Sequence, residues 1–137
     1  MAQQRAKFAY TVVYVNDVGQ SVDFYKKAFG ISVRRLDHSQ RWGELDSGET
    51  TIAFTPLEQH ETAITGGVQT ADLGEPRNNV ELSFNFDDVD EAFKHAVAMG
   101  AVPVAQPEDK PWGQRVGYVR DINGVMLRLG SHVKEGN

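Results

Sequence analysis

Glu81 and Arg128 are charged residues on two predicted strands in which every second residue is apolar. Residues 80–86 and 125–129 alternate with a period of two, which predicts strands with one covered face. Glu81 and Arg128 fall on the opposite face, where a charge must be paired or hydrogen-bonded if it is buried. They could form a structural ion pair. Alternatively, Arg128 could clamp an anionic or carbonyl group of a ligand while Glu81 orients it.

Aromatic side chains occur close to these strands. Trp42 flanks a predicted strand, Tyr10 and Tyr14 lie on another, and Trp112 belongs to the tight loop 110–114. Aromatic walls with a few polar groups are typical of small-molecule pockets. The alternative for Trp112 is a purely structural role, in which the indole closes a packing contact.

Other catalytic or metal-binding motifs are missing from the sequence. There is no Cys, so neither a disulfide nor a thiolate site can form. His38, His60, His95 and His132 have no metal-ligand spacing, and we expect them to be surface or structural residues. No Ser stands in a nucleophile elbow, and no Gly-rich phosphate loop follows a strand.

Charge and hydropathy restrict the partners. The formal net charge is −5 without a basic patch, which argues against nucleic-acid binding. No apolar run is long enough to span a bilayer, and the N-terminus lacks the apolar core of a signal peptide. We therefore expect a cytoplasmic protein that is not attached to a membrane.

An internal repeat supplies the elements that must position these residues. Residues 15–30 and 86–100 each read as a strand end, an Asp-Val helix start, an amphipathic helix and a closing Gly, and the starts differ by 86 − 15 = 71 positions. Asp17 and Asp88 are predicted to cap helices rather than to be catalytic. Each copy is predicted to form a βαβββ module.

The expected boundaries make residues 1–137 a single domain, with module one at about 7–56, a linker at about 57–79 and module two at about 80–132. Helices are expected over 18–29 and 88–99, and the linker is expected to lack regular structure because Pro, Gly and Asn interrupt it. The predicted strands are 8–15, 31–36, 42–46, 50–55, 80–86, 102–105, 115–119 and 125–129.

Two segments resemble one known superfamily. Residues 14–18 (Tyr-Val-Asn-Asp-Val), followed by 21–25 (Ser-Val-Asp-Phe-Tyr) and Gly30, resemble the start of vicinal oxygen chelate proteins, which include glyoxalase I, bleomycin-resistance proteins and extradiol dioxygenases. Residues 120–127 resemble their closing hairpin, with Ile122 where Pro is common. The resemblance implies an α+β fold in which two tandem βαβββ modules form a curled mixed sheet around a cup-shaped cavity. It also implies a homodimer.

In metal-dependent members, the first and last strands of each module supply the ligands of one divalent ion. By resemblance, these positions are Tyr10, Ala53, Glu81 and Arg128. A catalytic Zn²⁺ needs three protein ligands, but Ala53 offers no donor atom and Arg128 is a permanent cation. The sequence therefore predicts neither a divalent metal nor another cofactor.

The leading expectation is a metal-independent small-molecule-binding protein that sequesters a planar or aromatic ligand, similar to bleomycin-resistance proteins. The alternative is a glyoxalase-like lyase, isomerase or dioxygenase with an atypical or absent metal site, in which Glu81 would be the general base and Arg128 would stabilise an oxyanion. An interaction domain with a vestigial cup is a third option. The predicted ligand-binding residues are Tyr10, Tyr14, Trp42, Ala53, Glu81, Ser83, Asn85, Trp112, Met126 and Arg128.

Overall fold

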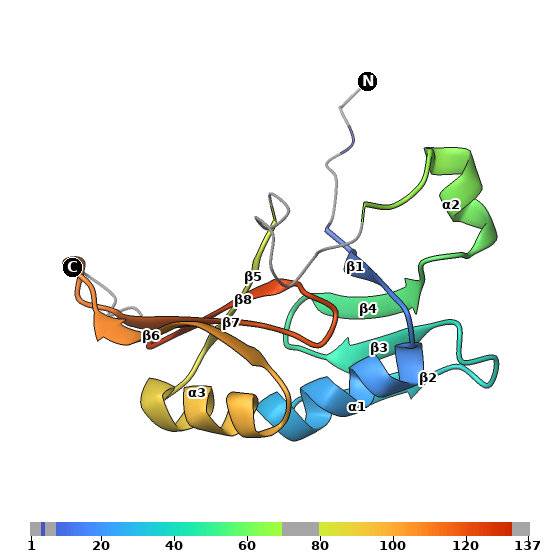
Figure 1. Cartoon of the computed structure of the whole chain (residues 1–137). Helices are drawn as coiled ribbons and strands as arrows, with labels where there is room; N and C mark the ends of the chain where they lie inside the picture. The colour runs from blue at the N-terminus through green and yellow to red at the C-terminus, as the bar shows by residue number, and fades with distance from the viewer. Residues whose placement is uncertain (1–3, 5–7, 70–79, 133–137) are drawn as a thin grey trace. The chain divides into compact units, whose positions relative to one another are not determined.

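The chain forms two compact units, each built around a four-stranded mixed sheet. A computed structural model describes residue 4, residues 8–69 and residues 80–132. The first unit comprises the described residues up to Lys26 together with Ile31–Val68, and the second comprises Lys27–Gly30 together with the described residues from Gln69 onward. Figure 1 shows the elements of both units in chain order.

The first sheet has the strand order β1-β4-β3-β2. Its strands are β1 (Tyr10–Val15), β2 (Ser32–Leu36), β3 (Gly43–Asp46) and β4 (Thr51–Pro56). The β1–β4 pair is parallel and the other two pairs are antiparallel. This mixed pattern follows from the βαβββ order, because a crossover helix joins parallel strands and short turns join antiparallel ones.

Helix α1 (Val18–Phe29) covers one face of this sheet, and its start and end follow the expected signals. The Asp17 carboxylate accepts a hydrogen bond from the Gln20 backbone N–H at 2.9 Å, which satisfies a free helix N–H. Gly30 follows the helix with φ +69°, a conformation that glycine adopts without strain. The rings of Tyr25 and Phe54 lie 5.2 Å apart, so α1 packs on the face of β4 that carries Phe54.

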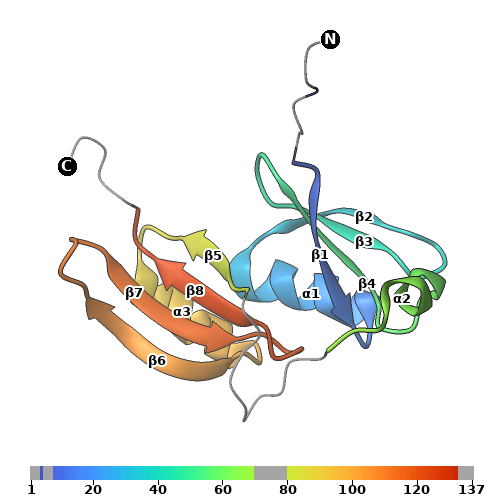
Figure 2. The same ribbon diagram turned by 90° about the horizontal axis from the view of Figure 1, so that it is seen from above.

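The second unit repeats this arrangement with the order β5-β8-β7-β6. Its elements are β5 (Leu82–Asn85), α3 (Val89–Ala98), β6 (Val102–Asp109), β7 (Arg115–Arg120) and β8 (Met126–Gly130). Seen from above, the four strands lie side by side with α3 across one face (Figure 2). Asp88 caps α3 by accepting from the Glu91 N–H at 3.1 Å, as predicted. The α+β class and the two βαβββ modules are thus confirmed.

Two features differ from the sequence-based expectation. Strand β6 extends to Asp109 rather than ending at 105, because its pairing with β7 continues past register shifts at Pro103/Ala105 and Ala105/Glu108. A short helix, α2 (His60–Thr65), stands where an irregular linker is predicted. The Gln59 side chain caps it by accepting from the Glu61 N–H, and Gly66 ends it with φ +95°. Residues 70–79 of the predicted linker lie outside the described residues.

The helices of the described residues are all too short or too polar to cross a membrane.

Candidate functional site

In the first unit, the face of the sheet away from α1 carries a buried carboxylate. Because Phe54 faces α1, its neighbour Ala53 faces the opposite side. Ala53 pairs with Val12 on β1 and with Glu44 on β3, so these three residues share that face. Glu44 is 9% exposed. Burial of a carboxylate requires compensation by donors or by a cation.

Glu44 has this compensation on both oxygens. Its Oε2 accepts from the Trp42 indole Nε1–H at 2.7 Å, and its Oε1 lies 3.3 Å from Arg34 Nε. Arg34 also donates to the Thr51 hydroxyl. The Tyr10 ring meets the Trp42 ring edge-on, with centroids 6.0 Å apart. This face of the first unit therefore presents a neutralised ion pair beside two aromatic rings.

In the second unit, the corresponding face carries a cation. Leu127 and Leu129 are fully buried, so Arg128 between them points to the other side of β8. Its neighbours across the sheet are Ser83 on β5 and Tyr118 on β7. Arg128 is half-buried, and its guanidinium carbon lies 5.8 Å from the centroid of the Trp112 ring. This distance is within the range of a cation–π interaction.

Gln114 joins Arg128 and Trp112. Its Oε1 accepts from Arg128 Nη2 at 3.1 Å and from Trp112 Nε1 at 2.9 Å, while its Nε2 donates to the Ser131 carbonyl at 2.7 Å. Gln114 is only 8% exposed. Gly130 leaves the space for it, since a Cβ atom there would lie 2.8 Å from Gln114 Nε2. The amide is thus fixed at both ends by three hydrogen bonds.

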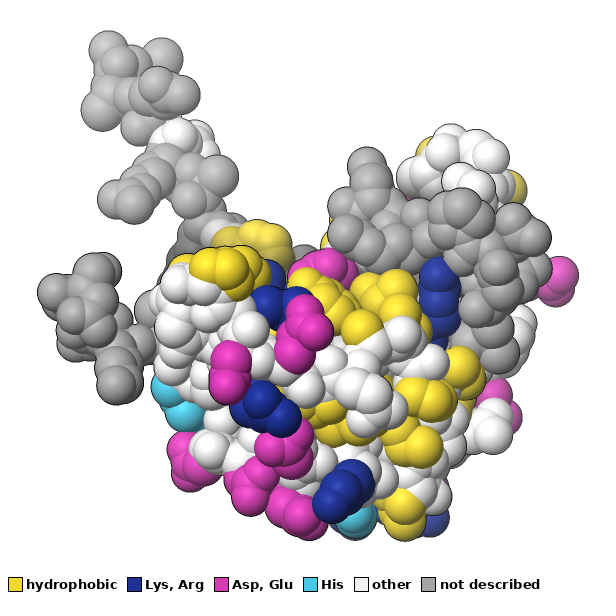
Figure 3. Space-filling model, turned by 60° about the vertical axis from the view of Figure 1, so that its left-hand side comes forward, with side chains coloured by type: hydrophobic (Ala, Val, Ile, Leu, Met, Phe, Trp, Pro, Cys, Tyr) yellow, Lys and Arg dark blue, Asp and Glu magenta, His cyan; other side chains and the backbone are white. Residues whose placement is uncertain are grey.

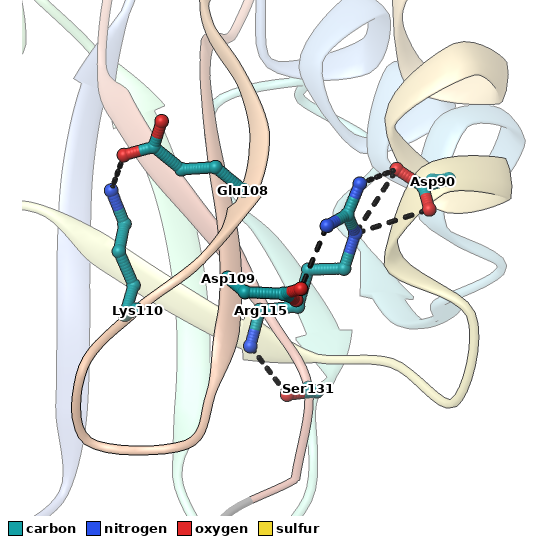
Figure 4. Close-up of polar contacts among 6 residues, drawn as sticks. All are labelled: Asp90, Glu108, Asp109, Lys110, Arg115 and Ser131. Atoms are coloured by element: carbon teal, nitrogen blue, oxygen red, sulfur yellow. Dashed lines mark hydrogen bonds and ion pairs between the residues drawn. The ribbon is translucent and has the colours of Figure 1, made fainter.

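Arg128 differs from the other arginine at this end of the sheet. Arg115 pairs with Asp90 at 3.0 Å and with Asp109 at 3.2 Å, and its backbone N–H donates to the Ser131 hydroxyl (Figure 4). Hydrogen bonds to these carboxylates, Asp90 first, raise the pKa of Arg115. Among the residues that the structure describes, no carboxylate pairs with Arg128; it contacts Gln114 and Trp112. Its charge is therefore not neutralised by a described acidic group.

The loop that carries Trp112 is held by its own contacts. The Lys110 N–H donates to the Gln114 carbonyl at 2.8 Å, and Gly113 N–H donates back to the Lys110 carbonyl at 3.0 Å with Gly113 at φ +93°. The Lys110 ammonium pairs with Glu108, and this hydrogen bond lowers the pKa of the Glu108 carboxyl. Lys110 is consequently paired, and Trp112 stays 61% exposed at the loop tip.

The structure places the ten sequence-predicted site residues in two groups. Tyr10, Tyr14, Trp42 and Ala53 belong to the first unit, and Glu81, Ser83, Asn85, Trp112, Met126 and Arg128 belong to the second. Ring contacts join Tyr10 with Trp42 and Trp112 with Arg128, and Ser83 pairs with Arg128 across β5 and β8. Glu81 is half-buried next to the start of β5, and an ion pair with Arg128 is not among the contacts of the described chain.

The donor set at the family's metal-ligand positions does not fit a divalent ion. Ala53 has no donor atom, and Arg128 directs a cationic group to the same face of its sheet as Ser83. A guanidinium at a ligand position repels a metal ion instead of binding it. Over the described residues, no cluster of three or more His, Asp or Glu side chains is arranged to hold a metal.

Glu44 and Gln114 were not among the site residues predicted from the sequence. Each follows a tryptophan by two positions with glycine between, in Trp42-Gly43-Glu44 and Trp112-Gly113-Gln114. In both cases the indole N–H donates to the acceptor two residues later. A tripeptide of tryptophan, glycine and a carboxylate or amide, occurring once in each module, was the signal that could have found both.

Acidic side chains outnumber basic ones over part of the molecular surface (Figure 3). Figure 3 shows Asp and Glu side chains gathered over the lower part of one face, among fewer basic ones. This distribution agrees with the net charge of −5. An anion approaching the protein meets no general attraction, so anion binding would depend on a local group such as Arg128.

The comparisons with known proteins agree with this architecture. The model of the Glyoxalase/Bleomycin resistance protein/Dioxygenase superfamily matches residues 7–129. The uncharacterized protein YraH of Bacillus subtilis is 32% identical over 116 residues, covering 84% of this chain and 90% of its own length. A crystal structure of a glyoxalase-related enzyme from Fulvimarina pelagi has a TM-score of 0.75 at 19% identity, covering 92% of this chain and 88% of that one.

A protein of unknown function from Agrobacterium tumefaciens gives a TM-score of 0.73 at 26% identity, over 95% of this chain and 97% of its own. The chain therefore belongs to the glyoxalase/bleomycin resistance protein/dioxygenase superfamily, as the resemblance implied. The superfamily hosts several chemistries on one fold, so membership defines the fold and the residues of the site must define the function.

Proposed function

We propose that this protein is a metal-independent binder that sequesters a planar or aromatic small molecule without breaking a bond in it. The observation that carries the proposal is the half-buried Arg128, which lies beside Trp112 and has no carboxylate partner among the described residues. Arg128 would hold an anionic or carbonyl group of the ligand, and Trp112 would stack on its ring.

The donor chemistry supports a function without metal. Of the four positions that carry ligands in metal-dependent members, Ala53 and Arg128 cannot bind a cation. Within the second unit, Met126 on β8 is proposed to add an apolar wall, and Ser83 and Asn85 on β5 are proposed to add polar groups. Superfamily members bind small molecules and often form dimers, so we also propose that this protein is a homodimer. The cytoplasm is the location that we propose for it.

Two measurements test the proposal. The first is elemental analysis of protein purified without chelator, reading Mn, Fe, Co, Ni and Zn. The second is a binding screen of aromatic carboxylates, neutral aromatics and aromatic amines, followed by quenching of the tryptophan fluorescence. We expect no near-stoichiometric metal and at least one ligand that quenches Trp112, with no turnover of that ligand.

The matched variants are Arg128→Ala and Arg34→Ala, which remove one arginine from each unit. Arg128→Ala is expected to weaken the ligand by about tenfold or more while the protein stays folded. Near-stoichiometric metal, with activity that depends on it, would instead favour the glyoxalase-like alternative. Strong destabilisation by Arg128→Ala with unchanged ligand affinity would make the arginine structural. Sedimentation velocity tests the homodimer separately.

A further inference from the structure

We infer that Gln114 is the residue that determines ligand specificity, and that the ligand class is a planar aromatic carboxylate. This inference rests on the proposed function and deepens it. Gln114 holds both groups of the proposed site, because one oxygen accepts from Arg128 at 3.1 Å and from Trp112 at 2.9 Å. A shared acceptor places the guanidinium and the indole at a fixed separation from each other.

The orientation of the Gln114 amide is determined by its third hydrogen bond. Nε2 donates to the Ser131 carbonyl at 2.7 Å, so Oε1 must be the atom that faces the two donors. Ser131 is itself held by two hydrogen bonds to the backbone of Arg115. The Arg115 N–H donates to the Ser131 hydroxyl, and the Arg115 carbonyl accepts from the Ser131 N–H, each at 2.9 Å. The amide cannot turn over without losing these contacts.

The neutral charge of Gln114 decides which ligands fit. A glutamine accepts from Arg128 without neutralising it, whereas a glutamate would pair with the guanidinium and would place a carboxylate against the Ser131 carbonyl. Within the described chain, the hydrogen bond to Gln114 uses one of the five N–H donors of Arg128. The remaining donors and the positive charge are available to a ligand carboxylate, which guanidinium binds in a planar, two-point geometry.

The aromatic half of the ligand class follows from Trp112. Its ring is 61% exposed although the indole N–H is fixed by Gln114, so the protein presents an ordered aromatic surface next to the cation. Lys110, the cation of the loop that carries Trp112, is paired with Glu108 and does not compete for the anion. A flat ring that bears a carboxylate would therefore stack on Trp112 while its oxygens contact Arg128.

The test is a titration followed by ¹⁵N NMR of the Trp112 indole N–H and the Arg128 side chain, with three matched probes. Sodium benzoate carries the ring and the carboxylate, benzamide replaces the charge by a neutral amide, and benzylamine inverts it. We expect benzoate to shift both signals and to bind at least about tenfold more tightly than benzamide or benzylamine. Equal or tighter binding of benzylamine or benzamide, or the absence of benzoate binding, would overturn the inference.

Two substitutions separate the specificity role from a structural one. Gln114→Glu keeps an acceptor for the Trp112 indole, so the indole signal should stay in its hydrogen-bonded position while benzoate affinity falls about tenfold or more. Gln114→Leu removes the acceptor and should lose both the indole position and the affinity. Lys110→Gln is the control and should leave benzoate affinity unchanged. Wild-type affinity in Gln114→Glu would show that Gln114 does not set specificity.

The outcome also distinguishes this inference from the proposed function. If the wild-type protein prefers a neutral or cationic aromatic compound, the inference fails while the proposal of a small-molecule binder stands. If no compound of the three classes binds to the wild-type protein, both fail.

Discussion

The two units of this protein use the same strand order but place charge on their helix-free faces in opposite ways. In the first unit, a buried carboxylate, Glu44, is neutralised by Arg34. In the second unit, Arg128 is held by the neutral amide of Gln114. A buried charge with a partner of opposite sign is a structural feature, whereas one held by neutral groups keeps its charge for a ligand. The contrast indicates a structural role for the first pair and supports the binding role that we propose for Arg128.

The two tryptophans make the same contrast. Trp42 donates to the Glu44 carboxylate, which Arg34 neutralises. Trp112 donates to the Gln114 amide oxygen, which also accepts from Arg128. The same local pattern of tryptophan, glycine and acceptor therefore occurs once with a neutralised carboxylate and once with a neutral amide. The difference comes from the acceptor, since glutamate attracts a cation permanently and glutamine leaves the cation unneutralised.

The largest expected effect is the response of stability to removing each arginine. Arg34→Met should lower the free energy of unfolding by about 2 kcal/mol, because it leaves the buried Glu44 carboxylate without its cation. Arg128→Met should change it by less than about 1 kcal/mol, since no described carboxylate loses a partner. Urea denaturation measures both. Adding Glu44→Gln to Arg34→Met should recover most of the loss, and equal losses for the two arginines would refute the contrast.

A smaller difference is expected between two glycines that make room for neighbours. A Cβ at Gly43 would lie 2.8 Å from Val22 Cγ1 and 3.0 Å from Val18 Cγ1, inside the packed core. Gly43→Ala should therefore cost about 1 to 2 kcal/mol. Gly130→Ala should cost less than Gly43→Ala, because the clash is with the Gln114 amide alone and not with two core side chains, but it should disturb the Trp112 indole signal.

The control for these two variants is Gly19→Ala, whose Cβ would meet the end of the exposed Gln40 side chain. It lies in helix α1, where alanine is favoured over glycine, so the thermal midpoint should not fall. A destabilisation by Gly130→Ala as large as that by Gly43→Ala would mean that Gln114 is locked into the core rather than held at a site.

Replacing each tryptophan by phenylalanine should have a still smaller effect. Trp42→Phe leaves Glu44 Oε2 without its donor and should cost about 1 kcal/mol. Trp112→Phe should cost about half as much or less, because Gln114 Oε1 keeps its bond to Arg128 and the ring is exposed. Urea denaturation of both variants checks the order, and a larger loss for Trp112→Phe would contradict it.

The smallest predicted effect concerns two exposed carboxyls, one in each unit. Hydrogen bonds from the Ser39 side chain and backbone lower the pKa of Asp37, and the hydrogen bond from Lys110 lowers the pKa of Glu108. Each lowered pKa gives stability that is present above the unfolded-state pKa and is lost as the pH falls through the folded-state value. Because salt screens the Lys110 charge, added salt should raise the pKa of Glu108 more than that of Asp37.

Carboxyl ¹³C NMR titrations at low and high salt measure this difference. Lys110→Gln should raise the pKa of Glu108 and leave that of Asp37 unchanged. Ser39→Ala should raise the pKa of Asp37 and leave that of Glu108 unchanged. If salt moves both carboxyls equally, the two units do not differ in how they stabilise these charges.

Much of the fold was predictable because its signals are local. The caps at Asp17 and Asp88, the helix stop at Gly30 and the period-two strands depend on residues a few positions apart. Helix α2 was not predicted, because its six residues are too short to show a period and its N-cap is Gln59 rather than Ser, Thr, Asp or Asn. The extension of β6 depends on bulges that only its partner strand can reveal.

The sequence by itself determined the repeat, the family and the identity of the residues with chemical potential, including Arg128 and Trp112. Only the tertiary structure decided which of them act together. Gln114 precedes β7, whereas Arg128 lies within β8 and Ser131 directly follows it. Gly130 makes room for the Gln114 amide, which lies over it. The reason is that the type of a residue defines the charge of its side chain. The groups that pair with or neutralise this charge depend on the neighbours that folding brings within hydrogen-bond distance.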